Sequence, residues 1–520
     1  MLSINSVLTY SVLDGMHPRM KRYLLISIAF IVVAIPLVLF SQSRLIAPDE
    51  GFYLLAAKLV MDGRVPYIDF FYPQGPLHPY IYGAWGFFTE ASWSSARFFS
   101  ALLGALSLAV LCPYIRREVG LWAAGVFVIL CATSELILPW FSLTKPYAAT
   151  ALALSFAFLS FCDTSCIKSA SRFLVGIFFL SLATQLRAYS IALLPLFTFL
   201  WIRRRGALKP DTRLVWAVAL VVVSCLPSLI LAMLGPDAFY FNNIGYHLVR
   251  VADPRDASVS AKFDILLKAL GIRAATRVGT LQPAILMVGF LTHLLIALFR
   301  RRMPSAAWCT AAVLFVVSLL PSPTHLQYFC LAAPFMIVAA LEAVDELRSL
   351  VPRALSLVLC ALCITAYVHG LSQALAIYVT GGPGVNGSSD TDAWSLENAD
   401  EIAGSINSLT TPGDLVMSEW PGYLYGTHAA ALPGMENHFG FVAAARLDEP
   451  SRRRYHVITR PDSMAYIKDP NVRLVLVPHN KRRASYDSLM SQSCFTEKAV
   501  IDSISLYQSC TARPNASGSP

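Results

Sequence analysis

The sequence predicts an α-helical polytopic membrane protein of about eleven spans, followed by a small α/β domain. Its composition supports this class, because 56% of the 520 residues are hydrophobic and only 14% are charged. A soluble domain usually carries about 25% charged residues. Apolar runs follow one another up to residue 379, and a polar region with mixed periodicity comes after them. We therefore expect a transmembrane domain at residues 23–379, a linker at 380–395 and a second domain at 396–520.

Eleven apolar runs approach the roughly 20 residues that a bilayer crossing requires. They cover residues 23–40, 96–115, 121–141, 146–162, 173–186, 188–202, 213–234, 281–299, 306–320, 325–341 and 354–379. The first run follows Arg19, Lys21 and Arg22, as in a signal peptide, but it is longer than the usual apolar region of about 7–15 residues. We expect it to remain as the first helix. The run at residues 76–90 is an ambiguous extra.

Short basic clusters separate these runs and predict the orientation of the chain, because Lys and Arg gather in cytoplasmic loops. The clusters are Lys21/Arg22, Arg116–Arg117, Lys168/Arg172, Arg203–Arg205, Arg300–Arg302 and Arg348/Arg353. All of them are cytoplasmic only if run 76–90 does not cross. Residues 1–22 are then cytoplasmic, residues 42–95 form the first outer loop, and the C-terminal domain is extracytoplasmic. Since this pattern explains the net charge of +9, we do not expect nucleic-acid binding.

The C-terminal region begins with "TGGPGVNGSSDTD", a composition typical of a linker. Beyond it, residues 397–408 have a helical pattern, and "DLVMSEW" and "VRLVLVP" have the pattern of strands. We expect a small α/β domain that is held loosely to the membrane part. Cys494 and Cys510 lie in this polar region. They are either a disulfide, if the compartment is oxidising, or two unrelated thiols.

The first outer loop contains "APDEGFYLLAAKLVMDG", residues 47–63. Pro48 followed by two acids suits the first turn of a helix, where the partial positive charge of the backbone favours carboxylates. The next apolar residues fall on one face, so we expect an amphipathic helix that lies along the outer membrane surface and ends at Gly63. Asp49 and Glu50 are either caps of this helix, or acids at the rim of a cavity where one accepts a proton from an acceptor hydroxyl or amine.

This loop and the helix before it resemble the first outer loop of the GT-C superfamily, integral-membrane glycosyltransferases that use polyprenyl-phosphate-linked sugars. The branch it resembles is the bacterial family similar to protein O-mannosyltransferases and lipid A aminoarabinose transferases. Three further stretches are similar to parts of that family: "FYPQGPLHPY", "SPTHLQYFCLAAPFMIVAALEAV" and "TPGDLVMSEWPGYLYGTHAAALPGMENHFG". The resemblance implies a glycosyltransferase of the bacterial inner membrane. It would move a sugar from a polyprenyl-phosphate donor to an envelope glycan, lipid or protein on the outer face.

The resemblance also implies roles for single residues. Asp49 matches the catalytic base of the family. Glu50 matches a neighbouring acid that orients the acceptor or helps to hold a divalent cation, and no other cofactor is expected. Arg187, in "LATQLRAYSIALLP", matches a basic residue that binds the lipid phosphate, which a guanidinium fits well. The alternative for Arg187 is an arginine that snorkels at a helix end.

Two positions depart from the pattern of the family. Lys145 stands where relatives often carry an Asp, and Gln74 stands where they often carry a Lys. Lys145 suggests a second cation near the donor phosphate. The remaining candidates for substrate binding are Tyr72 and His78 in "FYPQGPLHPY", and His325 and Tyr328 at the outer start of a late helix. For the histidine of the first loop a buried interface role is the alternative, and for the late pair it is an aromatic belt.

Together these expectations describe an inverting transfer in which the polyprenyl phosphate leaves. Arg187, helped by Lys145, would stabilise the charge of the leaving group, and Asp49 would deprotonate the acceptor. Two other classes remain open. A transporter or flippase would show inverted repeats and ionisable residues near the bilayer midplane, and a non-catalytic relative would bind polyprenyl phosphate without turnover.

Overall fold

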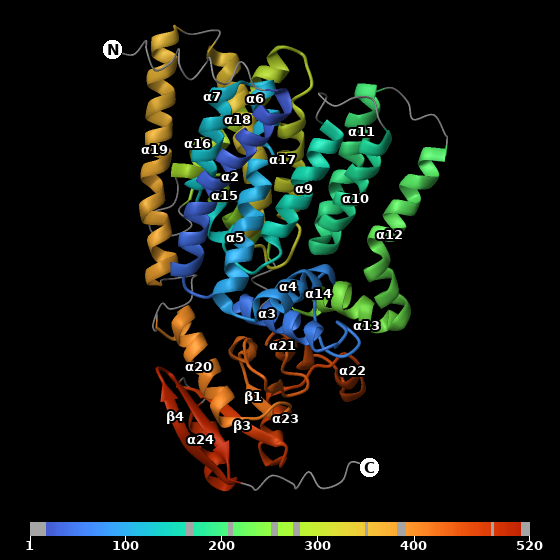
Figure 1. Ribbon diagram of the computed structural model, residues 1–520, viewed down its shortest axis with the longest axis vertical. Coiled ribbons are helices and arrows are strands. Elements are labelled where there is room, and N and C mark those ends of the chain that lie inside the picture. The colour runs from blue at the N-terminus through green and yellow to red at the C-terminus, as the bar shows by residue number, and fades with distance from the viewer. Residues whose placement is uncertain are drawn as a thin grey trace.

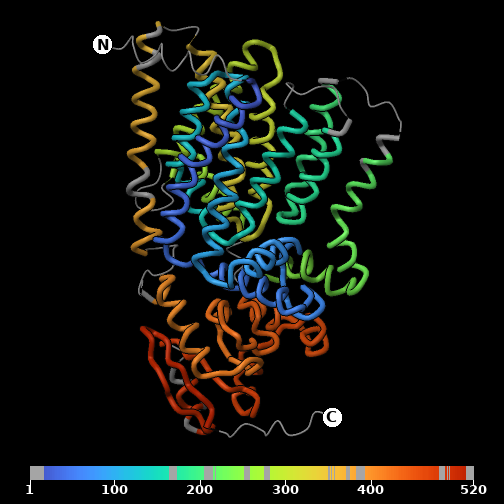
Figure 2. Tube along the Cα trace, in the orientation of Figure 1, coloured from blue at the N-terminus to red at the C-terminus, as the bar shows by residue number. Residues whose placement is uncertain are grey.

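A bundle of long helices stands on a layer of short helices, and a domain with a β-sheet lies below that layer (Figures 1 and 2). This arrangement is seen in a computed structural model of the 520-residue chain. The structure describes residues 17–162, 170–205, 212–250, 258–273, 281–348, 352–381, 392–479 and 483–510. Lys168, one of the predicted cytoplasmic residues, lies outside the described ranges.

The prediction of a multi-pass helical membrane domain is confirmed. The helices of the bundle are α2 (Pro18–Ser43), α5 (Trp93–Ala109), α6 (Cys112–Glu118), α7 (Leu121–Ala132), α9 (Tyr147–Cys162), α10 (Ala170–Leu186), α11 (Leu193–Arg205), α12 (Thr212–Leu234), α16 (Leu281–Phe299), α17 (Ala306–Val317), α18 (Ala333–Arg348) and α19 (Arg353–Thr380). Each of the eleven apolar runs falls on one or two of them. Within the described residues, four helices are by length and composition alone sufficient to cross a membrane: Pro18–Ser43, Trp93–Glu118, Leu281–Phe299 and Val358–Thr380.

Small residues let these helices approach closely, as is usual where lipid removes the hydrophobic drive to associate. On α5, Ala101, Gly104 and Ala105 are buried against neighbouring helices. A Cβ added at Gly104 would lie 2.9 Å from the Cβ of Phe141, so only glycine fits there. The helix α9 lies at the centre, with 14 of its 16 residues buried.

Three of the predicted spans are interrupted near the layer of short helices. Run 121–141 breaks after α7 and resumes as the short helix α8 (Leu138–Phe141). The other two runs begin with 3₁₀ turns, η1 (Ala188–Ala192) before α11 and η4 (Leu326–Leu331) before α18. Irregular backbone at membrane depth is tolerated where protein buries it or where it lines a water-filled cavity. The interruptions therefore point to a cavity at this end of the bundle.

Short helices close this end of the bundle (Figure 1). They are α3 (Pro48–Met61), α4 (Leu77–Thr89), α13 (Pro236–Tyr240), the π-helix η2 (Phe241–Gly245) and α14 (Tyr246–Val249); α15 (Val259–Ala269) follows in the same loop. The ambiguous run 76–90 corresponds to α4, which lies in this layer beside α3 and not among the long helices (Figure 1).

The C-terminal domain contains helices and a mixed five-stranded sheet. Its elements are η5 (Asp392–Trp394), α20 (Leu396–Leu409), β1 (Leu415–Ser418), η6 (Pro421–Leu424), β2 (Ala430–Ala431), α21 (Gly440–Ala444), α22 (Glu449–Arg454), α23 (Arg460–Ala465), η7 (Tyr466–Lys468), β3 (Val472–Pro478), α24 (Arg483–Gln492), β4 (Phe495–Ile501) and β5 (Ile504–Ser509). The two predicted strand segments lie on β1 and β3 of that sheet. The strand order is β2-β1-β3-β5-β4, with parallel pairs on one side of β3 and antiparallel pairs on the other. The central strand β3 is almost fully buried, which explains its continuous apolar run.

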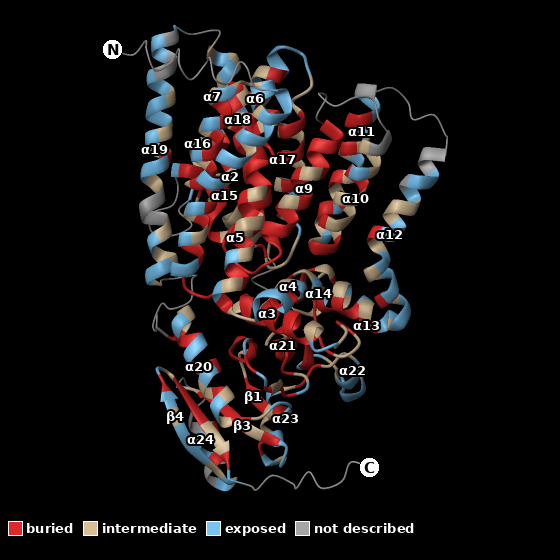
Figure 3. Cartoon of the chain, viewed as in Figure 1, coloured by how far each residue is buried: buried red, intermediate tan, exposed pale blue. Residues whose placement is uncertain are grey.

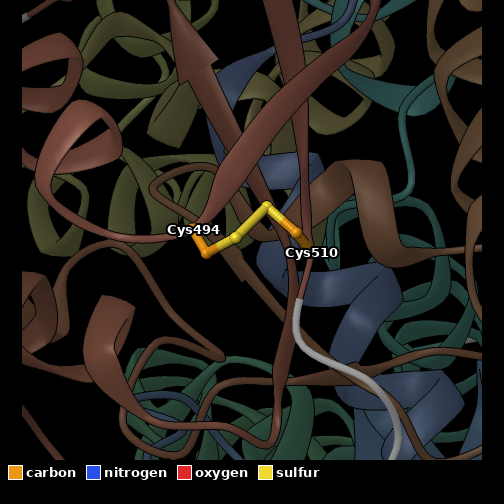
Figure 4. Close-up of a disulfide and its surroundings, with 2 residues drawn as sticks. All are labelled: Cys494 and Cys510. Atoms are coloured by element: carbon orange, nitrogen blue, oxygen red, sulfur yellow. A yellow bond between two sulfur atoms is a disulfide. The ribbon is translucent and has the colours of Figure 1, made fainter.

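Cys494 and Cys510 form a disulfide beside the hairpin of β4 and β5 (Figure 4), with their Cα atoms 5.3 Å apart. The backbone N–H of Cys510 also donates to the carbonyl of Cys494 at 2.8 Å. Of the two alternatives that the sequence left open, the bonded pair is the one observed. A disulfide of this kind suits an oxidising compartment, as expected if the domain lies outside the cytoplasm.

The expectation of a loosely held domain is wrong, because α3 is sandwiched between the bundle and the domain. Residues 50–59 of α3 are all buried, and Figure 3 shows this burial on both sides of the boundary. Trp420 donates from Nε1 to the carbonyl of Pro48 at 2.9 Å, and Lys58 donates from Nζ to the carbonyl of Ala429 at 2.8 Å. The domain therefore covers the face of α3 that we expected to meet water, and α3 is not an amphipathic helix on the membrane surface.

Candidate functional site

A cavity of about 640 Å³ opens where the interrupted spans meet the start of α3 and the C-terminal domain. This volume is within the range of about 300–1,000 Å³ that small-molecule sites occupy. Its lining residues are Arg44, Ala47, Pro48, Asp49, Phe52, Tyr53, Pro73, Gln74, Trp140, Lys145, Arg187, Tyr246, Arg250, Pro323, His325, Gln327, Tyr328, Tyr378, Phe439 and Val442. They come from every layer of the molecule, so the cavity depends on the whole fold.

The charges on the cavity wall are unbalanced. Among the lining residues Arg44, Lys145, Arg187 and Arg250 carry guanidinium or ammonium groups, and Asp49 carries the carboxylate. A low-dielectric cleft lined mainly by one sign of charge concentrates ligands of the opposite sign. The wall therefore suits an anionic ligand, and a guanidinium binds phosphate oxygens in particular.

Asp49 and Lys145 form an ion pair at the cavity wall. Lys145 donates from Nζ to Asp49 Oδ2 at 2.8 Å and to Gln327 Oε1 at 3.1 Å. The Asp49 side chain is 28% exposed, and that of Lys145 is 5% exposed. Burial is the largest single influence and raises the pKa of the Asp49 carboxyl, but the Lys145 ammonium, its hydrogen bond and the nearby His438 and His325 together lower it by more, so the pKa lies below its ordinary value. Asp49 is therefore ionised at neutral pH and faces the cavity.

Glu50 forms a different pair with Arg97, a residue of α5. The two guanidinium nitrogens Nη2 and Nε of Arg97 donate to Glu50 Oε1 and Oε2 at 2.6 and 3.0 Å, and both side chains are 0% exposed. Glu50 Oε1 also accepts from the backbone N–H of Ala47 at 2.9 Å, which caps α3. Oε2 accepts from the N–H and hydroxyl of Thr144, each at 3.2 Å. Every oxygen of this buried carboxylate is satisfied.

These contacts fix the position of the Asp49–Lys145 pair. Thr144 directly precedes Lys145, and Glu50 directly follows Asp49, so the Glu50–Thr144 hydrogen bonds tie the two backbone segments together. The remaining donor capacity of Arg97 goes to the carbonyls of Ser41, Arg44 and Leu45 at 3.0, 2.7 and 3.2 Å. The end of α2, the start of α3 and the segment before α9 therefore meet at the buried Arg97–Glu50 pair.

Arg187 precedes η1 as its N-cap residue and lines the cavity. Its guanidinium carbon lies 4.4 Å from the ring centre of Tyr147 and 5.7 Å from that of Tyr328. Aromatic faces attract a cation without neutralising it. Its Nε is buried and has no hydrogen-bond partner among the described residues. A buried donor without a partner is costly unless a ligand satisfies it, so Arg187 is the strongest candidate to hold an anion.

Arg250 and Arg44 complete the cationic wall. Arg250 donates from Nε to the carbonyl of Ser322 at 2.7 Å. Arg44 donates to the carbonyls of Leu45 and Pro139 and lies 4.8 Å from the ring centre of Tyr378. Burial lowers the pKa of Arg44 to about 10, and the group stays cationic at neutral pH. Because both guanidinium groups meet only carbonyl oxygens and rings in these contacts, their charge remains available to a ligand.

The C-terminal domain supplies part of the wall through Phe439 and Val442. The ring centre of His438 lies 4.2 Å from that of Phe439, with the two rings tilted, and 5.9 Å from that of Phe52. Burial lowers the pKa of His438 to about 4, while the nearby Asp49 opposes this change. Its Nδ1 is buried without a hydrogen-bond partner among the described residues. A neutral imidazole therefore lies beside the acid of the site.

Six of the nine predicted site residues line the cavity: Asp49, Gln74, Lys145, Arg187, His325 and Tyr328. Residues that are up to 279 positions apart in the chain are thus brought together (328 − 49). Lys145 differs from expectation in its partner, because it contacts Asp49 as well as facing the cavity.

Glu50, Tyr72 and His78 need correction, since they lie behind the cavity wall. Each is 0% exposed, and none of them is among the lining residues. His78 Nε2 is 2.9 Å from the carbonyl of Thr144, and its ring stacks on Tyr82. Burial between α3, the bundle and the domain has taken these side chains away from the cavity. Their contacts support the structure around the site.

The alternative in which Glu50, with Asp49, helps to hold a divalent cation does not fit the contacts. Both oxygens of Glu50 are taken by Arg97 and by backbone and hydroxyl donors. Asp49 would then be a single carboxylate next to an ammonium group. Divalent hard cations prefer several oxygen ligands. No group of three His, Cys, Asp or Glu side chains with the geometry of a metal site occurs in the part of the chain that the structure describes.

Sequence reasoning missed several functional residues. The most important is Arg97, which lies in the run 96–115. A charged side chain inside a span is rare and calls for a named partner, so this signal was present in the sequence. Arg44, directly after the first run, and Arg250, in "YHLVRVADPRD", carried weaker signals. Nothing local marked Phe439 and Val442 as cavity residues.

Comparison with known proteins identifies the fold. No family model matches the sequence, and no curated protein matches it. Among solved structures, ArnT from Cupriavidus metallidurans in the apo state matches with a TM-score of 0.64 and 15% identity, over 92% of this chain and 97% of that one. The same protein bound to undecaprenyl phosphate matches with a TM-score of 0.64 and 15% identity, over 94% and 98%. The chain therefore has the fold of ArnT over nearly its full length.

Proposed function

We propose that this protein is a glycosyltransferase that moves a sugar from a polyprenyl-phosphate donor to an envelope glycan, lipid or protein. The observation that carries the proposal is the cavity, in which one ionised carboxylate shares a wall with four cationic side chains. The ArnT fold adds support, because one of the two matching ArnT structures is bound to undecaprenyl phosphate. A long-chain lipid phosphate combines the anionic group and the apolar tail that such a cavity in a membrane domain would take.

The donor phosphate binds to Arg187 in this proposal. Its unpartnered Nε and its position over two tyrosine rings leave it free to pair with phosphate oxygens. During transfer the bond between the sugar C1 and the phosphate oxygen breaks, and the polyprenyl phosphate takes the electron pair. Arg187 and Arg250 stabilise the negative charge that grows on the leaving phosphate.

The acceptor is activated by Asp49. Its hydroxyl or amine forms the new bond to C1 from the opposite face of the sugar, and Asp49 takes the proton that is lost. The lowered pKa of Asp49 keeps it ionised, which a base requires, although it also makes the base weaker. Approach of the acceptor between Asp49 and Lys145 would replace their ion pair and restore basicity at the moment of reaction.

The proposed orientation follows the basic clusters, which predict a cytoplasmic N-terminus and an extracytoplasmic C-terminal domain in a bacterial inner membrane. The disulfide in that domain agrees with this orientation. The cavity then opens at the outer face, where polyprenyl-phosphate donors and envelope acceptors meet.

The test is a transfer assay with the purified full-length protein. The protein is incubated with several polyprenyl-phosphate sugars and a cell-envelope extract, and mass spectrometry follows the label into acceptor molecules. We expect transfer from at least one donor. Asp49→Asn should lower turnover on the order of 10²- to 10⁴-fold with the affinity for polyprenyl phosphate retained. Arg187→Gln should weaken that affinity on the order of 10- to 100-fold. Glu135→Gln, an acid-to-amide change outside the cavity lining, is the matched control.

One observation favours a second candidate, a protein that binds polyprenyl phosphate without catalysis. Lys145 occupies the position where the resemblance leads us to expect a second acid, and it neutralises Asp49. The same assay separates the two candidates. A binder would retain lipid affinity that depends on Arg187, but it would transfer no sugar from any donor, and Asp49→Asn would change nothing.

A further inference from the structure

A second cavity, of about 420 Å³, lies on the outside of the bundle between α2 and α7, far from the functional site. Figure 1 shows α6 and α7, which contribute lining residues, near the end of the bundle opposite the C-terminal domain. The lining residues of the cavity are Lys21, Leu24, Leu25, Ile28, Ala29, Val32, Arg116, Leu121, Ala124, Gly125, Val128 and Ile129. The lining is thus apolar except for two basic side chains.

The apolar part has the form of a groove with a floor of small residues. Ala29 of α2 and Ala124 of α7 are buried, with 2% and 1% exposure, while Ile28 and Ile129 on the sides are exposed. A Cβ added at Gly125 would meet no other atom within 4 Å. The groove is therefore open toward the bilayer at Gly125, and the shape suits an unbranched acyl chain lying along the two helices.

The polar end of the groove carries positive charge. Lys21 belongs to the first turns of α2, and Arg116 belongs to α6 at the end of the second predicted span. No acidic residue is among the described residues that line the groove. The neighbouring Arg117 is not among the lining residues; it pairs with Glu118 and lies over the ring of Tyr114 at 5.4 Å. Two cations thus lie at the level where an apolar groove meets the membrane surface.

We propose that this groove binds one phospholipid with an anionic headgroup, taken from the leaflet opposite the C-terminal domain. The basic clusters predict that this is the cytoplasmic leaflet. The acyl chain occupies the groove between α2 and α7, and the phosphate and headgroup lie between Lys21 and Arg116. Charge complementarity selects this occupant, because a zwitterionic lipid offers no net charge to the two cations. Such a lipid would hold α7 against α2 and stabilise the folded membrane domain.

Native mass spectrometry of the purified full-length protein in detergent tests this proposal. The protein is titrated with phosphatidylglycerol or with phosphatidylcholine of the same acyl chains. A basic residue at a membrane surface favours anionic lipid about 5-fold, so two should give a preference on the order of 30-fold. The double variant Lys21→Gln/Arg116→Gln should lose the preference. Arg117→Gln removes a charge outside the groove lining and should retain it. Gly125→Leu fills the groove and should weaken the binding of both lipids.

Equal binding of the two lipids to the wild type would overturn the proposal, as would a preference that survives the double substitution. Retention of both lipids by Gly125→Leu would show that the groove is not where the chain lies. Residues 1–16 of the chain are the other occupant to test. If phosphatidylglycerol bound only after their deletion, the groove would belong to the protein's own N-terminus and the proposal would fail. Since the two sets of variants alter different helices, a folding defect in one leaves the other as a test.

Discussion

Asp49 and Glu50 are adjacent in the sequence, yet their side chains lie in two different regions of the molecule. Glu50 is sealed between α2, α5 and the start of α9, where Arg97 binds both of its oxygens. Asp49 faces the cavity with an exposed fraction of 28%, and a single ammonium group contacts it. One carboxylate at the start of α3 is thus buried and stabilises the structure, and the carboxylate next to it remains accessible from the cavity.

The difference shows how the fold prepares an accessible carboxylate. Desolvating Glu50 is costly, and only the two-point contact with Arg97 and the additional donors offset that cost. In return, this network fixes the backbone that presents Asp49. Asp49 itself keeps part of its exposure and has one partner that an incoming substrate can replace. The buried Glu50–Arg97 pair therefore positions the site, and the accessible Asp49–Lys145 pair beside it is the one available for chemistry.

The largest effect is expected from breaking the buried pair. Arg97→Met leaves Glu50 buried without a counter-charge and should lower the free energy of unfolding by about 3–5 kcal/mol. Thermal or denaturant unfolding in detergent measures this change. The double variant Arg97→Met/Glu50→Leu removes both charges and should recover much of the loss. If the single variant were as stable as the wild type, the buried pair would not be the structural element that we describe.

A smaller effect is expected where the domain meets α3. A Cβ on Gly51 would lie 2.8 Å from the Cα of Gly422 and from the Trp420 ring, so Gly51→Ala must shift the domain or the helix. Overpacking of this kind costs about 1–3 kcal/mol. Gly404 is the control, because it lies in α20 with no atom near a new Cβ. Gly404→Ala should instead stabilise the protein by roughly 0.5–1 kcal/mol. Equal stability changes of the same sign would contradict a close contact at Gly51.

The smallest change in stability is expected at the Asp49–Lys145 pair. Breaking this pair should instead change how the rate of sugar transfer depends on pH. Lys145→Met should cost about 1 kcal/mol or less in unfolding free energy, because Asp49 keeps contact with water. Lys145 lowers the pKa of Asp49, so its removal raises that pKa. The base must be ionised, and the acidic limb of the pH–rate profile should therefore move to higher pH. Lys145→Arg keeps the charge and should leave that limb in place.

The pH dependence of stability follows the same sign. A carboxyl whose pKa is lowered by folding stabilises the folded state above its unfolded pKa, and this contribution is lost as the pH falls through the folded pKa. Both Asp49 and Glu50 belong to this class. In the pH–rate profile of Lys145→Met, an acidic limb that moved to lower pH would contradict the claim that the ion pair lowers the pKa of Asp49.

The helices of the bundle could be predicted because bilayer crossing depends on the length and apolarity of continuous segments, which are local properties. The interruptions were not predicted, although the break in run 121–141 coincides with three polar residues, Thr133, Ser134 and Glu135. Likewise, "DLVMSEW" and "VRLVLVP" showed their strands, whereas the docking of the domain on α3 depends on distant contacts such as Lys58 with Ala429.

For the site, the sequence indicated which residues belong together but not how they pair. Asp49 and Lys145 are 96 residues apart, and no periodicity connects them. Tyr72 and His78 were candidates for substrate binding, with a buried interface role as the alternative for His78, and both are buried. Arg97 carried a signal that a lone charge in a span provides, and a search for its counter-ion would have indicated Glu50.

The most direct test compares the two isosteric changes Asp49→Asn and Glu50→Gln, with sugar transfer and thermal unfolding measured on the same preparations. Asp49→Asn should abolish most of the turnover and leave the unfolding temperature nearly unchanged. Glu50→Gln should lower the unfolding temperature strongly, while the protein that remains folded at low temperature still transfers sugar. The reverse assignment, with turnover lost in Glu50→Gln at full stability and retained in Asp49→Asn, would contradict the account.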